Sequence, residues 1–305
     1  MSNELFQIDP REYLDLDVYA VIGNPIAHSL SPEIHSQFAT QTQQKIHYGK
    51  IFCELGGFKR VVEVFFARGG MGLNVTVPFK SEAFNLCTKL TDRAWAAGAV
   101  NVLTKVQGIY CGDNSDGVGL VRDLEQASCS FLASNILIIG AGGAVQGTVL
   151  PLMEKFPARI VIANRTLEKA QKVVERFNNE ATRHQVEIKA ISIADLTKEN
   201  QAFDLIINCT SSGLNHQSPL TDDLAKHLVN LSQQEKKDTL VYEMVYGKIT
   251  PFLEQFNALG SRTRDGFGML VEQAAVAFES WISVEKDQKL DTFTVLQGLR
   301  KKFQN

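Results

Sequence analysis

The chain of 305 residues is long enough for about two domains, each burying its own hydrophobic core. Its formal net charge of -3 and its 21% of charged residues exclude the broad basic surface expected of a nucleic-acid-binding or membrane-binding protein. The five cysteines are widely spread and form no C-x-x-C pair, so we expect free thiols in a reducing compartment and no metal site. The polar N-terminus and the lack of an apolar run of about 18 residues indicate a soluble, cytoplasmic protein.

The first half of the chain alternates between predicted strands and predicted helices. Apolar residues between Phe58 and Phe66 recur at helical spacing, for example, and Gly69-Gly70 ends that helix. Strands that alternate with helices indicate an α/β protein with a largely parallel, covered sheet. In chain order the sequence predicts a strand at 18–23, a helix at 31–43, a strand at 48–55, a helix at 56–68, a strand at 72–77, a helix at 80–90, a hairpin at 99–110 and a helix at 117–127.

The second half opens on a continuous apolar strand, Asn135 to Ile139, of the kind that helices cover on both faces. A glycine turn follows, and then a helix that reaches about Lys155. Pro151 falls inside this helix and should kink it, at a cost of about 3 kcal/mol. Further strands are predicted at 158–166, 202–213 and 239–247, and the chain returns in a long amphipathic helix at 266–282.

The glycine turn has the context of a dinucleotide-binding fingerprint, between an apolar strand and a helix. It comprises Gly140, Ala141, Gly142, Gly143 and Ala144. Small residues let backbone N–H groups approach a pyrophosphate, and the helix N-terminus adds a positive potential. The third small residue of the G-x-G-x-x-G pattern would fall at Val145, which is bulky. By itself, the turn fits either a nucleotide site or a tight structural turn.

The end of the next predicted strand indicates which cofactor would bind. An NAD site normally places an Asp or Glu there to accept from the ribose hydroxyls. Here the strand ends in Asn164, Arg165 and Thr166, with Lys169 one turn further. A carboxylate would repel a 2′-phosphate, whereas these donors can bind it. Arg165 also fits a surface arginine that begins a helix, but its topological position favours 2′-phosphate recognition. The predicted cofactor is NADP.

Residues 74–80, NVTVPFK, raise a question about a lysine, because Pro78 ends a strand-like alternation and leaves Lys80 at its end. This lysine is either a solvated helix start or a functional group. The motif resembles one of the shikimate dehydrogenase family, and five others match in order: GNPIAHSLSP at 23–32, GAVN at 98–101, GDNSDG at 112–117, GAGGA at 140–144 and NRT at 164–166. The resemblance runs from Val18 to about Trp281. It implies the reduction of 3-dehydroshikimate to shikimate by NADPH, on the route to chorismate and the aromatic amino acids.

The resemblance implies that Lys80 is the acid/base group and that Asp116 pairs with it. Hydride delivery to a ketone creates an alkoxide, which an ammonium can stabilise and protonate, and a neutral amine can remove the proton in the reverse direction. The family's aspartate motif reads Asn114-Ser115-Asp116-Gly117 here, with a Ser in place of a Thr that keeps the hydroxyl. From the residues alone, Asp116 would be a helix N-cap.

The resemblance also implies the other site residues. Ser29 and Ser31 match the pair that binds the substrate carboxylate. Ser31-Pro32 is also a helix start with Ser31 as its N-cap, which leaves the Ser29 hydroxyl free for a ligand. We expect His28 to be structural. Contacts to the substrate ring are implied for Thr76, Asn101, Tyr246 and Gln273, and cofactor contacts for Met244, Gly266 and Asp92.

Three departures from the family pattern stand out. Glu243 occupies a position where Asp is usual, and the loop before Thr250-Pro251 is a residue shorter than in some relatives. Val102 follows Asn101 where a Thr is common. The first two departures lie next to Tyr246, so they bear on the segment that the resemblance assigns to both ligands.

The predicted architecture has an N-terminal α/β substrate domain with a mostly parallel, mixed sheet at 1–122, completed by C-terminal helices at 265–305. A Rossmann-like NADP-binding domain occupies 123–264. Substrate and cofactor would meet in the cleft, and the two crossings between the domains suggest closure on binding. The partner is a small molecule, with no nucleic acid, membrane or metal involved, and the protein would be a monomer or a homodimer.

Two alternative functions share part of this pattern. A broad-specificity quinate/shikimate dehydrogenase that uses NAD or NADP would also carry Lys80 and Asp116, but in place of Asn164-Arg165-Thr166 it would show an acidic residue or a different loop. A non-catalytic, NADP-binding regulator would keep the glycine turn without needing the Lys80–Asp116 pair. Both residues of that pair are present, which favours an enzyme.

Overall fold

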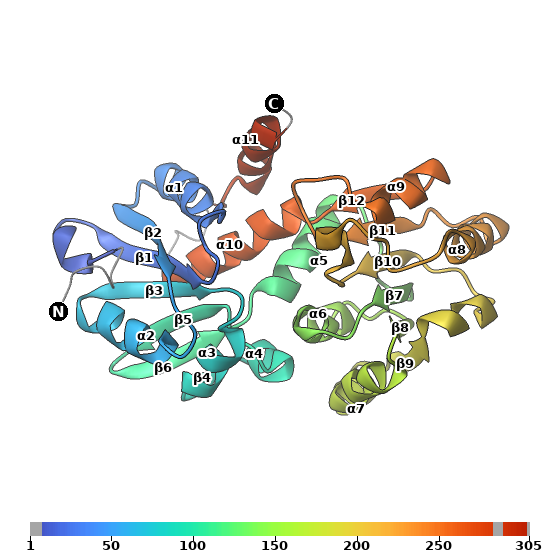
Figure 1. Cartoon of the computed structure of the whole chain (residues 1–305), viewed down its shortest axis with the longest axis horizontal. Helices are drawn as coiled ribbons and strands as arrows, with labels where there is room; N and C mark the ends of the chain where they lie inside the picture. The colour runs from blue at the N-terminus through green and yellow to red at the C-terminus, as the bar shows by residue number, and fades with distance from the viewer. Residues whose placement is uncertain (1–7, 283–288, 304–305) are drawn as a thin grey trace. The chain divides into compact units, whose positions relative to one another are not determined.

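The computed structural model describes residues 8–282 and 289–303. Its residue contacts divide the chain into two compact units (Figure 1). The first comprises the chain up to Gly119 together with Val271–Lys301, and the second comprises Leu120–Leu270 and the chain end from Lys302. The backbone passes from one unit to the other within α5 (Asp116–Gln126) and again within α10 (Phe267–Trp281).

The first unit is built on a six-stranded mixed sheet in the order β2-β1-β3-β5-β6-β4. β1 runs parallel to β2 and β3, while β5 is antiparallel to both β3 and β6, and the short β4 is parallel to β6. The strands are β1 (Asp17–Gly23), β2 (Ile46–Phe52), β3 (Gly70–Val75), β4 (Lys89–Leu90), β5 (Val102–Val106) and β6 (Ile109–Asp113).

Helices cover both faces of this sheet. Side chains of β1 alternate between the two faces and pack against helices on each. Val18, Ala20 and Ile22 pack against α2, which is amphipathic as its spacing predicts. On the other face, Tyr19 stacks on Trp281 of α10 with ring centroids 5.0 Å apart. The helices and short helical turns of this unit are η2 (Pro10–Glu12), α1 (Ser31–Thr42), α2 (Phe58–Ala67), α3 (Lys80–Leu86), α4 (Asp92–Ala97) and α11 (Thr292–Phe303).

One predicted helix of the first unit is wrong in its second half. The sequence predicts a helix at 80–90, but α3 ends at Leu86 and Lys89–Leu90 forms β4. Cys87 leaves the helix with an extended backbone, and the Thr88 N–H donates to the Tyr110 carbonyl at 3.0 Å. Pairing with β6 thus overrides a helical pattern. The predicted hairpin forms β5 and β6, shifted a few residues toward the C-terminus.

The second unit is a six-stranded, fully parallel sheet in the order β12-β11-β10-β7-β8-β9. The order in which successive strands join the sheet reverses between β7 and β10, as in a doubly wound nucleotide-binding sheet. The fold class predicted from the sequence is therefore confirmed. The strands are β7 (Asn135–Ile139), β8 (Arg159–Asn164), β9 (Glu187–Ser192), β10 (Leu205–Asn208), β11 (Leu240–Glu243) and β12 (Arg262–Asp265).

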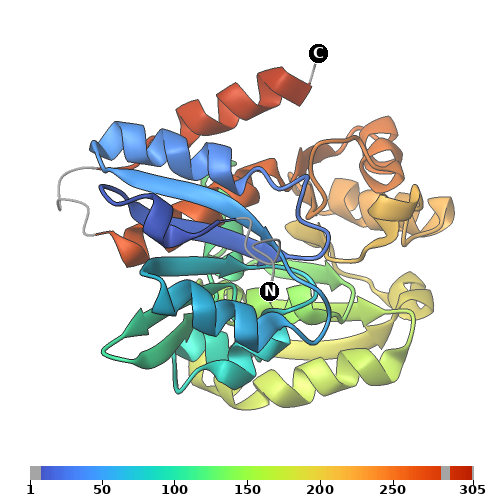
Figure 2. The same cartoon turned by 60° about the vertical axis from the view of Figure 1, so that its left-hand side comes forward.

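Helices cover both faces of the second sheet as well (Figure 2). Side chains of α8 and α9 pack on Leu137, Val161 and Val241. Pro151 lies in α6, which ends two residues later at Met153, so its missing N–H falls within the last turn of an 11-residue helix. The helices and short helical turns here are α6 (Gly143–Met153), α7 (Leu167–His184), η3 (Ile193–Lys198), η4 (Ser212–Asn215), α8 (Asp222–Gln234) and α9 (Pro251–Ala258).

Candidate active site

Lys80 and Asp116 form an ion pair at one edge of the first sheet. Lys80 begins α3 and Asp116 begins α5, and the Lys80 Nζ lies 2.6 Å from the Asp116 Oδ2. Phe79, fully buried and stacked on Phe58, fixes the backbone just before the lysine. The side chains of the pair are 29% and 16% exposed, so the ammonium can reach both a ligand and solvent.

Both carboxylate oxygens of Asp116 are occupied. Oδ1 accepts from the Asn101 Nδ2 at 2.8 Å, while Oδ2 accepts from Lys80. The Asp116 backbone N–H donates to the Asn114 Oδ1 at 3.1 Å. The interpretation of Asp116 as an N-cap is wrong, because α5 begins at Asp116 itself. Its carboxylate bonds Lys80 and Asn101, which lie in two other segments. Held at both oxygens, it fixes the direction in which Lys80 points.

A buried polar network extends from this pair. Asn101 is 3% exposed, its Oδ1 accepts from the Ser115 N–H at 2.8 Å, and its carbonyl accepts from the Asn74 Nδ2 at 3.1 Å. The Asn74 Oδ1 in turn accepts from the Tyr48 hydroxyl at 2.6 Å. The Ser115 Oγ lies 3.5 Å from the Gln273 Oε1 of α10, which brings Gln273 to the same network.

Sequence reasoning missed Asn74 and Tyr48 as members of this network. Asn74 carried a signal, because it stands two residues before Thr76 in the NVTVPFK motif, and side chains at that spacing share one face of a strand. Tyr48 gave no such signal in the sequence, because only the pairing of β2 with β1 brings it close to Asn74. Next to Tyr48, His35 is fully buried and stacks on it with ring centroids 4.1 Å apart. Burial lowers the pKa of His35 to about 3, so the ring is neutral.

Ser29 lies in the loop between β1 and α1, and Ser31 is the first residue of α1. The predicted N-cap is wrong, because Leu30 is the cap and Ser31 is already helical. The Ser29 Oγ is also not idle, since it accepts from the Ser31 N–H at 3.3 Å and lies 3.2 Å from the Ser31 Oγ. The two hydroxyls remain adjacent and can point toward one anion. His28 beside them is exposed.

Thr76 follows β3 at the same sheet edge and is half-buried. A Cβ on Gly23 would lie 2.5 Å from the Thr76 methyl, so only a glycine at the end of β1 allows this close approach. The ends of β1, β3 and β6 and the beginning of the antiparallel β5 meet at one edge of the sheet. This arrangement brings together Lys80, Asp116, Asn101 and the loop that carries Ser29.

The glycine turn of the second unit is open on the side where side chains would stand. A Cβ on Gly142 or Gly143 would meet nothing within 4 Å. Gly140 has a φ of +119°, a conformation that favours glycine. A Cβ added to it would lie 3.2 Å from the Thr210 methyl. Val145 is fully buried in α6 and so does not narrow the turn. The backbone amides at the start of α6 could hold a pyrophosphate, at the switch between β7 and β10.

The predicted 2′-phosphate residues end β8 and begin α7. Arg165, Thr166 and Lys169 are exposed, and Thr166 is the N-cap of α7 without a side-chain capping bond. Arg165 lies two residues before α7 begins and Lys169 lies in its first turn, so both cations belong to the same helix start. The Asn164 Nδ2 donates to the Thr166 carbonyl at 2.8 Å and so orders the turn that carries them.

Met244, Gly266 and Tyr246 lie together at the ends of β11 and β12. A Cβ on Gly266 would lie 2.2 Å from the Met244 carbonyl oxygen, so a glycine is required there. Tyr246 is half-buried, its ring centroid lies 5.2 Å from that of Phe267, and burial raises the pKa of its hydroxyl. Asp92, by contrast, belongs to the first unit, where it is the exposed first residue of α4.

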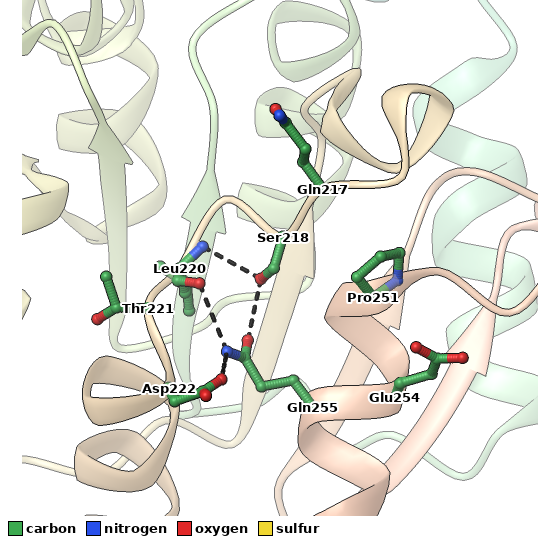
Figure 3. A pocket seen from close by; sticks show the side chains of 8 residues that line it. All are labelled: Gln217, Ser218, Leu220, Thr221, Asp222, Pro251, Glu254 and Gln255. Carbon is green, nitrogen blue, oxygen red and sulfur yellow. Dashed lines mark hydrogen bonds between the residues drawn. The ribbon is translucent and has the colours of Figure 1, made fainter.

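A hollow of about 650 Å³ in the second unit lies between the beginnings of α8 and α9 (Figure 3). The Gln255 Nε2 donates to the Asp222 Oδ1 at 2.6 Å, and the Ser218 Oγ donates to the Gln255 Oε1 at 2.9 Å. These polar side chains thus bond one another. None of the site residues predicted from the sequence is among the residues that line it: Gln217, Ser218, Leu220, Thr221, Asp222, Pro251, Glu254 and Gln255.

Across residues 8–282 and 289–303, no three His, Cys, Asp or Glu side chains are grouped so as to hold a metal ion. None of the helices described in the structure has both the length and the apolar character to cross a bilayer. A doubly wound sheet with an open glycine turn, in a chain that also holds a lysine–aspartate pair among amides and hydroxyls, defines a nicotinamide-dependent oxidoreductase.

Comparison with known proteins identifies the family. Residues 21–103 match the family model described as the shikimate dehydrogenase substrate binding domain, and residues 123–241 match shikimate / quinate 5-dehydrogenase. Shikimate dehydrogenase (NADP(+)) of Janthinobacterium sp. is 44% identical over 94% of this chain and 98% of its own length. The enzyme of the same name from Methylobacillus flagellatus is 46% identical over 93% and 99%.

Solved structures agree. An Ael1 enzyme from Pseudomonas putida is 38% identical, with a TM-score of 0.81, over 93% of this chain and 98% of that one. Shikimate 5-dehydrogenase from Thermus thermophilus, solved with NADP(H) and shikimate, is 25% identical, with a TM-score of 0.77, over 94% and 99%. The chain therefore belongs to the shikimate dehydrogenase family, and the resemblance seen in its motifs is confirmed.

Proposed function

We propose that this chain catalyses the reversible, NADPH-dependent reduction of 3-dehydroshikimate to shikimate, with Lys80 as the acid/base group. The observation that carries the proposal is the ion pair of Lys80 with a carboxylate fixed at both oxygens. Relatives 44% and 46% identical bear the name of an NADP-dependent shikimate dehydrogenase, which supports both substrate and cofactor. The reaction belongs to the synthesis of chorismate and the aromatic amino acids.

The chemistry needs one hydride and one proton. NADPH supplies the hydride when bound. As the carbonyl carbon accepts the hydride, its oxygen becomes an alkoxide, and the Lys80 ammonium stabilises that charge and gives up a proton to it. Lys80 is then a neutral amine that regains a proton from water, to which its partial exposure gives access. In the reverse direction the neutral amine takes the proton from the hydroxyl. Asp116 holds the lysine in place throughout.

Substrate would be held by the polar groups at the same edge of the first sheet. The adjacent hydroxyls of Ser29 and Ser31 would bind the carboxylate. Thr76, Asn101, Asp116 and Gln273 would contact ring hydroxyls, together with Tyr246 from the second unit. Asn101, Asp116 and Gln273 already belong to one bonded network, which supports a preformed ring site.

The cofactor would lie along the second sheet. The open turn from Gly140 to Ala144 would take the pyrophosphate, and Asn164, Arg165, Thr166 and Lys169 would take the 2′-phosphate. Met244 and Gly266 would lie near the nicotinamide, with Asp92 as a further contact. The exposure of both cations beside an uncapped helix start supports NADP rather than NAD.

These roles divide the chain into a substrate-binding domain at 1–122, completed by 265–305, and an NADP-binding domain at 123–264. The substrate-domain match at 21–103 supports the first assignment. The free state of all five cysteines supports a reducing, cytoplasmic location. We propose a monomer or a homodimer.

The direct test is a matrix of shikimate and quinate against NADP⁺ and NAD⁺, read as reduced nicotinamide. The proposal predicts that shikimate with NADP⁺ gives by far the highest kcat/KM of the four pairs. Comparable rates with quinate and NAD⁺ would establish the broad-specificity alternative. No turnover with any pair, with NADP still bound, would establish the non-catalytic regulator.

A further inference from the structure

Glu243 is a fully buried carboxylate at the end of β11, directly before the segment that carries Met244 and Tyr246. It is also the position at which this chain departs from the Asp that is usual in the family. Buried carboxylates are rare in proteins unless their oxygens are bonded. What Glu243 bonds therefore indicates what it does.

Three donors converge on Glu243, all within the second unit. Its Oε2 accepts from the Asn208 Nδ2 at 2.8 Å and from the Thr250 Oγ1 at 3.0 Å. Its Oε1 accepts from the Val245 N–H at 3.1 Å. All three partners can donate at once to the ionised carboxylate, which therefore satisfies them. No described lysine or arginine forms an ion pair with it.

The bonds join segments that are far apart in the sequence. Asn208 ends β10, and its Oδ1 accepts from the Thr210 N–H at 3.0 Å and from the Thr210 hydroxyl at 2.8 Å. A Cβ added to Gly140 in the glycine turn would lie 3.2 Å from the Thr210 methyl. Thr250 is the N-cap of α9. Glu243 thus bonds the end of β10 to the segment that follows β11, and Asn208 in turn bonds Thr210, whose methyl lies close to the glycine turn.

This arrangement is costly for the fold. Burial raises the pKa of Glu243 above its ordinary value, and the bonds from Val245, Asn208 and Thr250 offset this only in part. A carboxyl group whose pKa is higher in the folded state than in the unfolded chain lowers the stability of the fold as the pH rises from its ordinary pKa through the raised one. A buried charge without a counter-ion is a poor way to stabilise a loop, so its use here points to a positional role.

We infer that Glu243 is the positioning residue of the segment Met244–Tyr246, which it anchors through the Val245 N–H to the loops behind the glycine turn. The inference rests on the proposed function, in which Met244 contacts the cofactor and Tyr246 the substrate. One carboxylate would then set the placement of a contact to each ligand.

Replacement by glutamine removes one part of this anchor. A glutamine at 243 can keep an oxygen toward Asn208 and Thr250, but its amide nitrogen then faces the Val245 N–H, donor against donor. Glu243→Gln therefore releases the segment while leaving a side chain of nearly the same size. Glu243→Asp keeps both oxygens and is the usual residue of the family, so it should restore much of the function.

A second buried carboxylate of the same unit provides a matched control. Glu199 is 7% exposed and accepts from the Arg159 Nη1 and the Lys189 Nζ, each at 3.0 Å. It joins η3 to the beginning of β8 and to β9, and no predicted ligand contact lies next to it. Glu199→Gln should lower the melting temperature and leave the kinetic constants within about twofold, because it unpairs a buried ion pair remote from the ligand contacts.

The experiment compares the wild type with these three variants in steady-state kinetics, thermal unfolding and amide hydrogen exchange of the free protein. For Glu243→Gln we expect kcat/KM to fall about tenfold or more for both NADP and shikimate, the size of effect that an unsatisfied buried donor produces. The melting temperature should fall less than in Glu199→Gln, and the amides of residues 244–246 should exchange faster than in the wild type. Glu243→Asp should stay within about threefold of the wild type.

Unchanged exchange at 244–246 in Glu243→Gln would overturn the inference, as would kinetic constants like those of the wild type. A kinetic loss no larger than the loss of folded protein would also overturn it, because the role would then be structural. The exchange measurement needs neither ligand nor turnover. If the wild type proved inactive with shikimate and NADP, the proposed function would fail while the exchange result would still decide the role of Glu243.

Discussion

The two units of this molecule present their proposed ligand contacts in opposite ways. In the first, Asp116 is bonded at both oxygens, and Asn101, Ser115, Asn74 and Tyr48 complete a buried network behind it. In the second, Gly142 and Gly143 present bare backbone, and Arg165 and Lys169 stand exposed. Proton transfer requires a side chain held in one direction, whereas phosphate binding requires amides and mobile cations that a charged ligand can gather.

The largest effect should come from removing the charge at the centre of the first network. Lys80→Met keeps a long side chain but loses every donor. If the ammonium stabilises the developing alkoxide, as we propose, kcat should fall by at least about 10²–10³-fold. Shikimate affinity, measured by calorimetry, should change much less, since Ser29, Ser31 and Asn101 remain.

The control for that variant is Lys89→Met, in the same unit. Lys89 is exposed at the start of β4 and has no predicted role in the site. Its replacement should leave kcat and affinity unchanged. Near-native turnover of Lys80→Met would instead identify Lys80 as a solvated helix start, and the contrast between the two units would lose its basis.

The burial of His35 in the first unit predicts a dependence of stability on pH. His35 is neutral in the folded state, with a pKa of about 3 caused by burial, while in the unfolded chain it would titrate near its ordinary value of about 6.5. Its contribution to stability is therefore complete above about pH 6.5 and is lost as the pH falls toward 3, by about 1.4 kcal/mol per pH unit.

Denaturant unfolding of the wild type and of His35→Phe, at about pH 7 and about pH 5, checks this slope. The phenylalanine keeps a ring against Tyr48 but cannot take up a proton. We expect the free energy of unfolding to fall less between the two pH values in the variant than in the wild type. An equal fall in both proteins would show that His35 does not titrate on unfolding.

The exposed cations of the second unit should give a smaller and more selective effect. Arg165→Ala should raise the KM for NADP about tenfold and hardly change that for NAD, because one charge-assisted contact to a phosphate is lost. Arg176→Ala, at another exposed position on α7, serves as the control and should change neither constant. An equal loss with both cofactors would remove the 2′-phosphate assignment.

Local pattern was enough to predict the parts of the fold that are local in cause. The apolar run of β7, the glycine turn and the helix after it lie in one continuous stretch, and so do the strand and the lysine of NVTVPFK. The Lys80–Asp116 contact could not be predicted from local sequence pattern. The two residues are 36 apart, and they meet only because β3 and β6 end at one edge with an antiparallel strand between them.

The errors have physical causes of the same kind. Lys89–Leu90 forms a strand in spite of its helical pattern, because its backbone pairs with β6. Ser31 is not a cap because Leu30 already turns the chain with a near-helical backbone. Tyr48 and Glu243 act through partners that only the tertiary structure brings to them. Residue type alone carried no sign of either role.

The central claim is that Lys80 and Asp116 work as one acid/base unit, and a double-mutant cycle tests it most directly. The measurement is kcat for shikimate oxidation by the wild type, Lys80→Met, Asp116→Asn and the double variant, each shown by calorimetry to bind shikimate. We predict that Asp116→Asn lowers kcat and that the double variant loses far less than the product of the two single losses, close to the loss of Lys80→Met alone. A loss equal to that product would show that the two residues act independently, and would contradict the account.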